Sequence, residues 1–217
     1  MAESRFTQNQ NRRRKPTNKK SGSRGIVLAV WGAILAVLIF AAVFVTSGYH
    51  ERVKKRVQNS QYPQSYSEYV EKSAKEFDLE PALVYAVIRT ESSFNVNAQS
   101  PAGAHGLMQI TEDTFEHYMN LRGEADKYTL EDLYDPAVNI EYGCNILRNH
   151  LDTFGDEECA VAAYNAGPGN VEAWLTDPAI SSDGKTLIVK NIPFEETRSY
   201  VQRVESAKEK YLELYYQ

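Results

Sequence analysis

A run of 21 uncharged residues, Ile26–Thr46, separates a short basic segment from the bulk of this 217-residue chain. A helix of that length spans about 31 Å at about 1.5 Å per residue, close to the hydrocarbon thickness of a bilayer. The apolar region of a cleavable signal peptide is shorter, and here Val43-Phe44-Val45 leads into residues 46–50 with no Ala-x-Ala site. The sequence therefore predicts a single N-terminal transmembrane helix, retained as an anchor within residues 25–49.

The charges on either side of this run predict its orientation. Residues 1–24 hold eight Lys and Arg against the single acid Glu3, a charge of +7, so the rest of the chain carries −12 of the total of −5. The positive-inside rule keeps the basic end in the cytoplasm and puts residues 50–217 outside, although four basic residues within 52–56 weaken the contrast. The basic segment indicates a topology signal that contacts anionic lipid, rather than a nucleic-acid site.

The remaining sequence predicts a polar tether and one helical domain. Residues 1–24 are nearly devoid of apolar side chains and are expected to be disordered. Residues 50–64 form the tether, and residues 65–217 form a domain with helical periodicity and no alternating strands, so the fold class is all-α. The helix that contains Tyr164 should end at the turn Gly167-Pro168-Gly169. The expected helices begin at the capping-box pattern Ser65–Glu68, at Pro81, after Thr111, at Asp135-Pro136, after Asp156 and at Thr197.

The helix expected from Pro81 ends with a carboxylate on its apolar face. Val87 and Ile88 belong to that face, and Glu91 continues it, four residues after Val87 and three after Ile88. Removal from water disfavours the charged form and raises the pKa of a glutamate, which makes it a proton donor near neutral pH. The alternative is a glutamate at a helix end that turns its carboxylate to water.

Short polar and glycine-containing stretches follow Glu91 at residues 92–104, 105–110 and 162–170. With the later run Ile192–Val201 they resemble the lytic transglycosylases of the soluble-lytic-transglycosylase (SLT domain) family, which cleave peptidoglycan glycan strands. The resemblance covers roughly residues 65–214 and implies a lysozyme-like fold. The matching residues are Glu91-Ser92-Ser93-Phe94-Asn95, Ser100, Gly103-Ala104, Gly106-Leu107-Met108-Gln109, Ala163–Gly169 and Ile192–Val201.

Glycoside cleavage ordinarily uses two carboxyl groups, and this sequence has one that is well placed. Glu112 and Asp113 fall at an expected helix start, where acids complement the helix dipole. The resemblance implies a mechanism that needs only Glu91. Glu91 protonates the glycosidic oxygen leaving from N-acetylmuramic acid (MurNAc). Its carboxylate then takes the proton of that sugar's 6-hydroxyl, which attacks C1 and closes a 1,6-anhydro ring.

Three residues of the first motifs match family positions around the acid. The resemblance implies that Ser100 and Gln109 hydrogen-bond the N-acetyl and hydroxyl groups of the sugar, and that Met108 provides an apolar wall. Ser100 precedes Pro101, so a plain turn residue is the alternative there.

Four residues of the later motifs complete the expected site. Tyr164 and Asn165 end a helix before the glycine turn. Tyr164 can offer a flat surface to sugar and a hydroxyl to Glu91 or the substrate. Packing in the core is the alternative, and the two roles are compatible. Glu196 and Tyr200 match the Glu-Thr-x-x-Tyr segment, which the resemblance implies binds substrate or orients the site. Glu196 is equally explained as a first-turn acid of the last helix.

The sequence predicts no metal and no cofactor. Four histidines are scattered, the two cysteines lie 15 residues apart, and no glycine-rich loop follows a strand. Cys144 and Cys159 are either a disulfide in an exported domain or two buried thiols.

The predicted function is therefore a membrane-anchored peptidoglycan lytic transglycosylase of the cell envelope. It would cleave the β-1,4 bond between MurNAc and N-acetylglucosamine (GlcNAc) on the extracytoplasmic side and leave 1,6-anhydroMurNAc ends. One alternative is a lysozyme- or chitinase-like hydrolase on the same fold. The other is a non-catalytic glycan-binding module of an envelope machine, which would have no reason to keep a costly carboxyl on an apolar face.

Overall fold

The computed structural model describes residues 22–216, and the chain forms two compact units, residues 1–58 and 59–217. The predicted basic segment, residues 1–24, lies outside the described residues except for its last three, which begin a helix. That helix, α1 (Gly22–Gln61), runs for 40 residues and includes residues 50–61 of the expected tether, residues 50–64.

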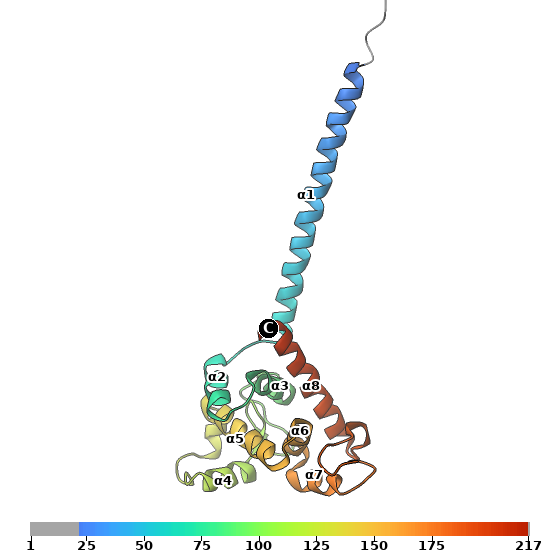
Figure 1. The fold of residues 1–217 in the computed structure, drawn as a ribbon. Helices are drawn as coiled ribbons and strands as arrows, with labels where there is room; N and C mark the ends of the chain where they lie inside the picture. The colour runs from blue at the N-terminus through green and yellow to red at the C-terminus, as the bar shows by residue number, and fades with distance from the viewer. Residues whose placement is uncertain (1–21, 217) are drawn as a thin grey trace, which may run out of the picture. The chain divides into compact units, whose positions relative to one another are not determined.

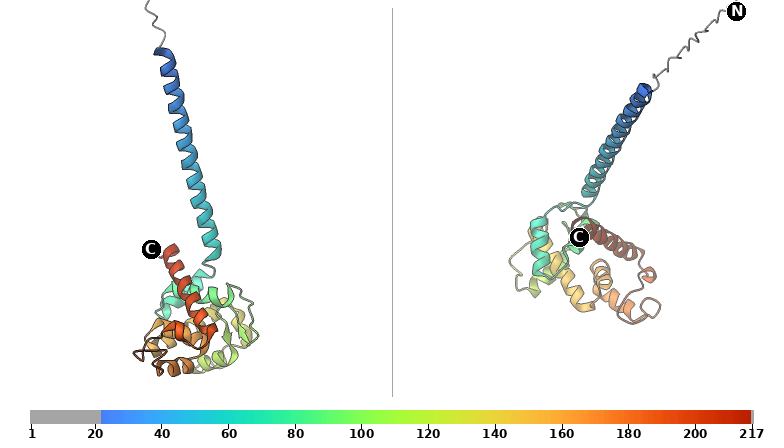
Figure 2. Two further views of the ribbon diagram at one scale, coloured as in Figure 1. Left: turned by 90° about the vertical axis from the view of Figure 1, so that its right-hand side faces the viewer. Right: turned by 45° about the horizontal axis from the view of Figure 1, so that its top comes forward.

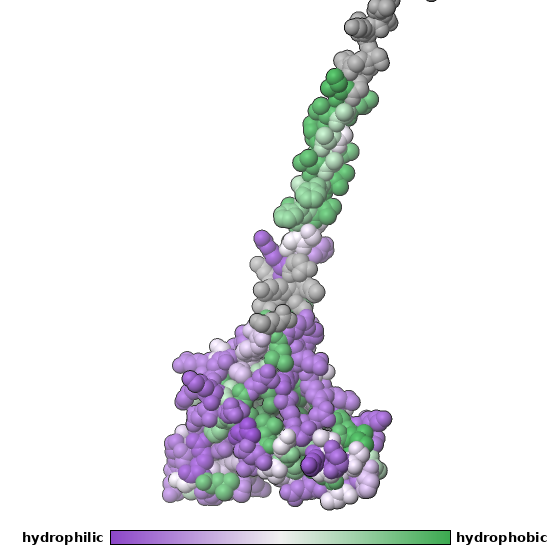
Figure 3. Space-filling view, in the orientation of Figure 1, coloured by the Kyte–Doolittle hydropathy of each residue, from purple (hydrophilic) through white to green (hydrophobic). Residues whose placement is uncertain are grey.

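The first unit contains a helix that is long and apolar enough to cross a membrane. Ile26–His50 has a mean hydropathy of 2.9, and none of the side chains of its most apolar stretch is buried in the protein. Leu28 and Phe40, for example, are 73% and 74% exposed, and this part of the helix forms the green band of Figure 3. The predicted apolar helix is thus confirmed in length and composition.

The second unit confirms the predicted all-α fold (Figure 1). Its elements, in order, are α2 (Ser67–Glu76), α3 (Pro81–Ser92), β1 (Ala104–His105), β2 (Ile110–Thr111), α4 (Glu112–Leu121), the 3-10 turn η1 (Leu130–Tyr134), α5 (Pro136–Phe154), α6 (Glu157–Ala166), α7 (Pro168–Leu175), η2 (Val189–Asn191) and α8 (Glu195–Tyr215).

Helix α3 lies at the centre of the domain because its sequence is apolar on every side. Residues 82–88 are all buried, which is the pattern of a helix surrounded by protein. Helix α8 packs along α3, and α2 covers another side of it. Helix α6 then joins α5 to α8 (Figures 1 and 2). This arrangement brings the C-terminal helix, far away in sequence, beside the end of α3.

Several local predictions differ from the structure. The capping box at Ser65 is wrong: α2 begins at Ser67, and Tyr66 takes the cap position in a left-handed conformation without a side-chain cap. Pro168 does not only end α6 but also opens the unpredicted helix α7, where its ring suits the first turn. The last helix begins at Glu195, two residues before the predicted start. The polar stretch that begins at residue 92 leads into the short hairpin of β1 and β2, in which Ala104 pairs with Thr111.

The segment from β1 to β2 is held by one buried amide. Asn139 of α5 is fully buried; its Oδ1 accepts from the backbone N–H of Met108 (2.7 Å), and its Nδ2 donates to the carbonyls of His105 (3.0 Å) and Leu133 (2.8 Å). Gly106 lies against the same amide, at a φ of +75°, and a Cβ there would come within 2.3 Å of Nδ2. The amide and the glycine therefore fix the path of this segment together.

Replacing Asn139 with Leu should destabilise the domain by about 3 kcal/mol or more. The change leaves three buried backbone groups unpaired, and each unpaired group costs about 1–3 kcal/mol. Chemical denaturation of the full chain in detergent measures this loss. The control is Asn170→Leu, which removes one exposed side-chain bond and should change stability by less than about 0.5 kcal/mol. Equal stability of the two variants would contradict the role of Asn139.

Candidate active site

Glu91 occupies the last turn of α3, where the helix meets α8. Just beyond it, Ser93 and Phe94 have positive φ values of 50° and 65°, which turn the chain sharply off the helix axis. The carboxylate Oε1 of Glu91 accepts a hydrogen bond of 2.7 Å from the hydroxyl of Tyr200 on α8. Tyr200 is only 2% exposed and Glu91 is half-buried. The carboxylate is therefore engaged by a buried hydroxyl instead of being free in water.

The surroundings of Glu91 favour its protonated form. Burial raises the pKa of Glu91 to about 7, and this effect exceeds the lowering of the pKa by the Tyr200 hydroxyl and by the positive charge of Arg203. The negative charge of Glu196 adds a smaller upward contribution to the same pKa. A carboxyl with a pKa near 7 is about half protonated at neutral pH, so it can both give and take a proton.

The chain that follows Glu91 is held in its path by bonds between its side chains and its own backbone. The Ser92 hydroxyl donates to the carbonyl of Leu107 at 2.8 Å. The Ser100 hydroxyl oxygen accepts from the backbone N–H of Ala104 at 3.0 Å. Gln109 donates from Nε2 to the carbonyls of Ala98 (3.2 Å) and Gly106 (2.9 Å). Ser100 and Gln109 thus hold the loop that follows Glu91 in the sequence.

Met108 differs from the apolar wall that the sequence suggested. Its side chain is fully buried, and a Cβ at Gly143 of α5 would lie only 2.3 Å from its sulfur. Met108 therefore packs in the core, in space that the glycine leaves free. Its backbone carbonyl accepts a hydrogen bond of 2.9 Å from the Tyr164 hydroxyl.

The remaining predicted residues come from α6 and α8. Tyr164 is half-buried, and burial, with a further contribution from the charge of Glu91, raises the pKa of its hydroxyl well above the ordinary value. Asn165 Oδ1 accepts from the hydroxyl of Thr197 at 2.8 Å, which joins α6 to the first turn of α8. Glu196 is exposed in that turn and reaches Glu91 through its charge alone.

Three residues that the sequence reasoning missed support the site: Asn139, Thr197 and Arg203. Arg203 follows Tyr200 by three residues, so it lies on the same face of α8, and helical spacing could have found it. Asn139 is a polar residue beside the buried Ile140, a signal that is visible but ambiguous in sequence. Nothing in the sequence shows that Thr197 meets Asn165.

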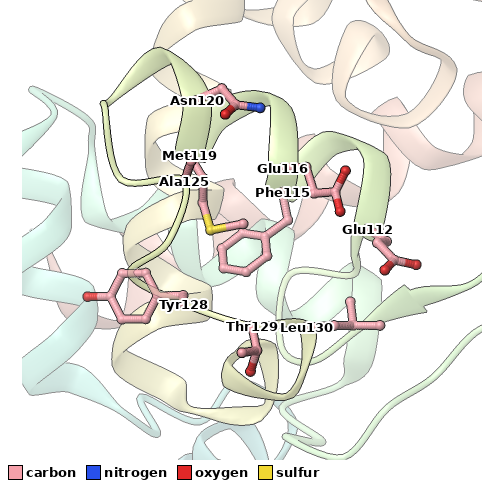
Figure 4. Close-up of a pocket in the computed structure, with 9 residues that line it drawn as sticks. All are labelled: Glu112, Phe115, Glu116, Met119, Asn120, Ala125, Tyr128, Thr129 and Leu130. Atoms are coloured by element: carbon pink, nitrogen blue, oxygen red, sulfur yellow. The ribbon is translucent and has the colours of Figure 1, made fainter.

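Among the described residues, no second carboxylate is hydrogen-bonded to Glu91. Glu112 and Asp113 are exposed in the first turn of α4, as expected for acids that complement the dipole. Glu112 lines a separate cavity of about 290 Å³, whose floor includes Phe115 and Met119 (Figure 4). Glu91 does not line that cavity.

Tyr164 also lines a larger cleft, of about 390 Å³, between α4, α5 and the turn into α7. His117, Tyr118 and Asn149 contribute to its wall, so the cleft mixes aromatic faces with hydrogen-bonding groups. Such a mixture suits sugars, which present apolar ring faces and hydroxyls together. Through Tyr164 this cleft adjoins the surroundings of Glu91.

The described residues, 22–216, contain neither a cluster of possible metal ligands nor a disulfide. Within that range no group of three or more His, Cys, Asp or Glu side chains could hold a metal ion. Cys144 and Cys159 are both buried and free, which agrees with the second of the two alternatives left open by the sequence. The Cys159 thiol donates to the carbonyl of Lys185 at 3.4 Å.

Several known proteins are similar to this chain. It is 36% identical over 144 residues to a soluble lytic murein transglycosylase of Salmonella typhimurium, an alignment that covers 66% of this chain and 22% of that protein. It is 32% identical over 171 residues to a membrane-bound lytic murein transglycosylase C of Haemophilus ducreyi, covering 69% of this chain and 46% of that one. The chain thus spans less than half the length of these relatives.

Solved structures of lytic transglycosylases are also similar to this chain. The 70 kDa soluble lytic transglycosylase of Escherichia coli matches with a TM-score of 0.66 and 31% identity, covering 72% of this chain and 25% of that one. An inactive mutant of a lytic transglycosylase of Pseudomonas aeruginosa matches with a TM-score of 0.64 and 34% identity, covering 71% and 25%. Residues 68–185, more than half of the chain, match the transglycosylase SLT domain family. The chain belongs to this family.

Proposed function

We propose that this chain is a membrane-anchored lytic transglycosylase that cleaves the β-1,4 bond between MurNAc and GlcNAc of peptidoglycan during cell-wall remodelling. The observation that carries the proposal is the protonatable carboxyl of Glu91, half-buried and bonded to Tyr200. The similar proteins are named lytic murein transglycosylases, and murein is peptidoglycan.

In the proposed reaction Glu91 first acts as an acid. Its proton passes to the glycosidic oxygen as the bond from that oxygen to C1 of MurNAc breaks. The Tyr200 hydroxyl, 2.7 Å from Oε1, then stabilises the carboxylate that remains. The carboxylate removes the proton of the MurNAc 6-hydroxyl while that oxygen attacks C1. The new C1–O6 bond closes the 1,6-anhydro ring, and Glu91 is again protonated.

The surrounding residues have binding and positioning roles in this proposal. The glycan strand passes over Glu91 and into the cleft that Tyr164 lines. Ser100 and Gln109 hold the backbone of the site, and Asn165 accepts from the Thr197 hydroxyl. All three present their remaining polar groups to sugar. Glu196 contacts substrate at the exposed edge, whereas Met108 supports the site from the core.

The apolar helix supports the proposed membrane location of the chain. Membrane-bound relatives occur among the similar proteins, and Ile26–His50 is long enough to span a bilayer. Because residues 1–24 carry +7, the N-terminus stays in the cytoplasm and residues 65–217 face the peptidoglycan.

Replacing Glu91 with Gln should leave a folded protein that cleaves almost no glycan. Gln keeps the volume of the side chain but cannot donate or accept the proton, and acid–base catalysis contributes about 10² to 10⁴ in rate. Turnover of purified sacculi measures the loss. Glu112→Gln is the matched control and should stay near wild-type activity. If Glu91→Gln retains near-wild-type turnover, the acid lies elsewhere.

The products should separate a transglycosylase from a hydrolase. Inverting and retaining hydrolases use a second carboxyl, whereas the 6-hydroxyl of MurNAc is held near C1 at a high effective concentration. Digested peptidoglycan should yield muropeptides that end in 1,6-anhydroMurNAc, one water lighter than hydrolysed ends and resistant to borohydride. Mass spectra dominated by reducing ends would assign the chain to the hydrolases.

The orientation of the anchor can be tested with terminal tags. Protease added to intact cells stripped of their wall should remove a C-terminal tag and spare an N-terminal one. Lysed cells are the control, in which both tags should be removed. Protection of the C-terminal tag in intact cells would reverse the proposed topology.

A further inference from the structure

The segment by which the chain enters the second unit is bonded to the two helices that carry Glu91 and Tyr200. This entry segment, residues 61–64, contains the last residue of α1 and leads towards α2. It precedes residues 68–185, which match the transglycosylase family. The sequence predicts a polar tether here, whereas the structure gives these residues defined partners in the domain.

Helix α8 holds the entry segment by two tyrosine hydroxyls. Tyr211 donates to the carbonyl of Pro63 at 2.9 Å, and Tyr215 donates to the carbonyl of Tyr62 at 2.7 Å. Tyr211 is fully buried. Its ring also meets the Tyr62 ring edge-on, with 5.5 Å between the ring centroids. The entry segment is therefore packed on the C-terminal half of the helix that supplies Tyr200.

Helix α3 holds the same segment through Arg89. The Arg89 Nε donates to the carbonyl of Gln61 at 2.9 Å, and the guanidinium lies over the Tyr62 ring, 4.3 Å from its centroid. Arg89 belongs to the last turn of α3, two residues before Glu91, and its carbonyl accepts the N–H of Ser93 that caps the helix. Contacts that restrain Arg89 therefore also restrain the turn that carries the acid.

A second path of contacts leads from the entry segment to the chain just beyond Glu91. The Tyr211 ring, which meets Tyr62, also stacks on Tyr85 of α3 with 5.2 Å between centroids. Tyr85 in turn contacts Phe94 at 6.4 Å. Phe94 has the positive φ of 65° that turns the chain off the end of α3, a conformation that a bulky residue keeps only where its surroundings hold it. Aromatic rings thus join the entry segment to the turn after the acid.

The position of a catalytic acid is critical, because a misplacement of about 1 Å can lower the rate about 10²-fold. Both paths of contacts end within three residues of Glu91, at Arg89 and at Phe94. Resting on the proposed function of Glu91, we propose that Tyr62 is a positioning residue. Through Arg89 and Tyr211 it holds the end of α3 so that the Glu91 carboxyl stays half-buried and aligned. The entry segment then takes part in catalysis, although it lies outside the family match.

Replacing Tyr62 with Ala in the full chain tests this inference. The change removes the ring contacts with Arg89 and Tyr211 but keeps the carbonyl that Tyr215 holds. On soluble, uncrosslinked peptidoglycan strands kcat should fall about tenfold with KM nearly unchanged, because a displaced acid weakens the transition state and not binding. Tyr62→Phe keeps the ring and should restore kcat. Tyr69→Ala, at an exposed position of α2, is the matched control and should keep the kcat and KM of the wild type.

The pH profile separates a positioning role from a merely structural one. Glu91 must be protonated to act as an acid, so kcat/KM falls as the pH rises through the pKa of that carboxyl, about 7 in the intact site. Since burial raises this pKa, water admitted by a loosened turn should lower it and move the alkaline limb of the profile to lower pH. Tyr62→Phe should keep the wild-type profile. The variants leave unchanged the other titratable and charged neighbours of the acid, which are Tyr164, Glu196, Tyr200 and Arg203.

Two kinetic outcomes would overturn the inference. One is an unchanged kcat in Tyr62→Ala. The other is a lower kcat with an unshifted pH profile, which would mean that the variant only reduces the amount of folded protein. If Tyr62→Ala does not fold, Tyr62→Leu replaces it, because leucine keeps apolar bulk but has no aromatic ring, and the same directions of change are expected.

Hydrogen exchange separates this inference from the proposed function, because it needs no substrate. In the full chain in detergent, the bonded amides of Ser93 and Asn95 should exchange at least about tenfold faster in Tyr62→Ala than in the wild type or Tyr62→Phe. Unchanged exchange would show that Tyr62 does not support this turn. If the wild-type chain cleaves no glycan while Tyr62→Ala exchanges faster here, the proposed function fails and the support of the turn by Tyr62 stands.

Discussion

Removing the Glu91 carboxyl from water is the constraint around which the domain is organised. A carboxylate on a buried helix face is unfavourable unless a partner donates to it. The partner is Tyr200, 109 residues later in the chain, so α8 must return along α3 to supply it. Thr197 on the same helix then fixes α6 through Asn165, and α6 in turn carries Tyr164 to the loop at Met108. One desolvated acid thus links three helices and the loop.

The parts of the structure that the sequence predicts are those set by local periodicity. The Glu91 helix and the helix from Pro136 were both visible in the sequence, because each has a strong start signal and apolar residues at helical spacing. The apolar anchor helix was equally plain, since its length and lack of charge are local properties. The importance of Glu91 followed from its position on an apolar face. Its catalytic role remains a proposal.

What the sequence did not reveal depends on contacts between distant segments. Met108 looked like a wall of the site, but Gly143 leaves a space into which its side chain fits. Pro168 looked like a helix stop, although proline is equally suited to the first turn of the next helix. Asn139 bonds to a backbone segment some 30 residues earlier in the chain. The pattern of side chains along one helix cannot predict such a contact between distant segments.

Both backbone polar groups of Met108 are held by side chains: its N–H donates to Asn139, and its carbonyl accepts from Tyr164. Ser92 and Gln109 fasten the residues around it. A loop fixed in this way has already lost most of its conformational entropy during folding. An arriving ligand then has little chain left to order, so more of the contact free energy remains as affinity and alignment. In the proposed function, the shape of this loop is set before the glycan arrives, so the loop selects the glycan instead of adapting to it.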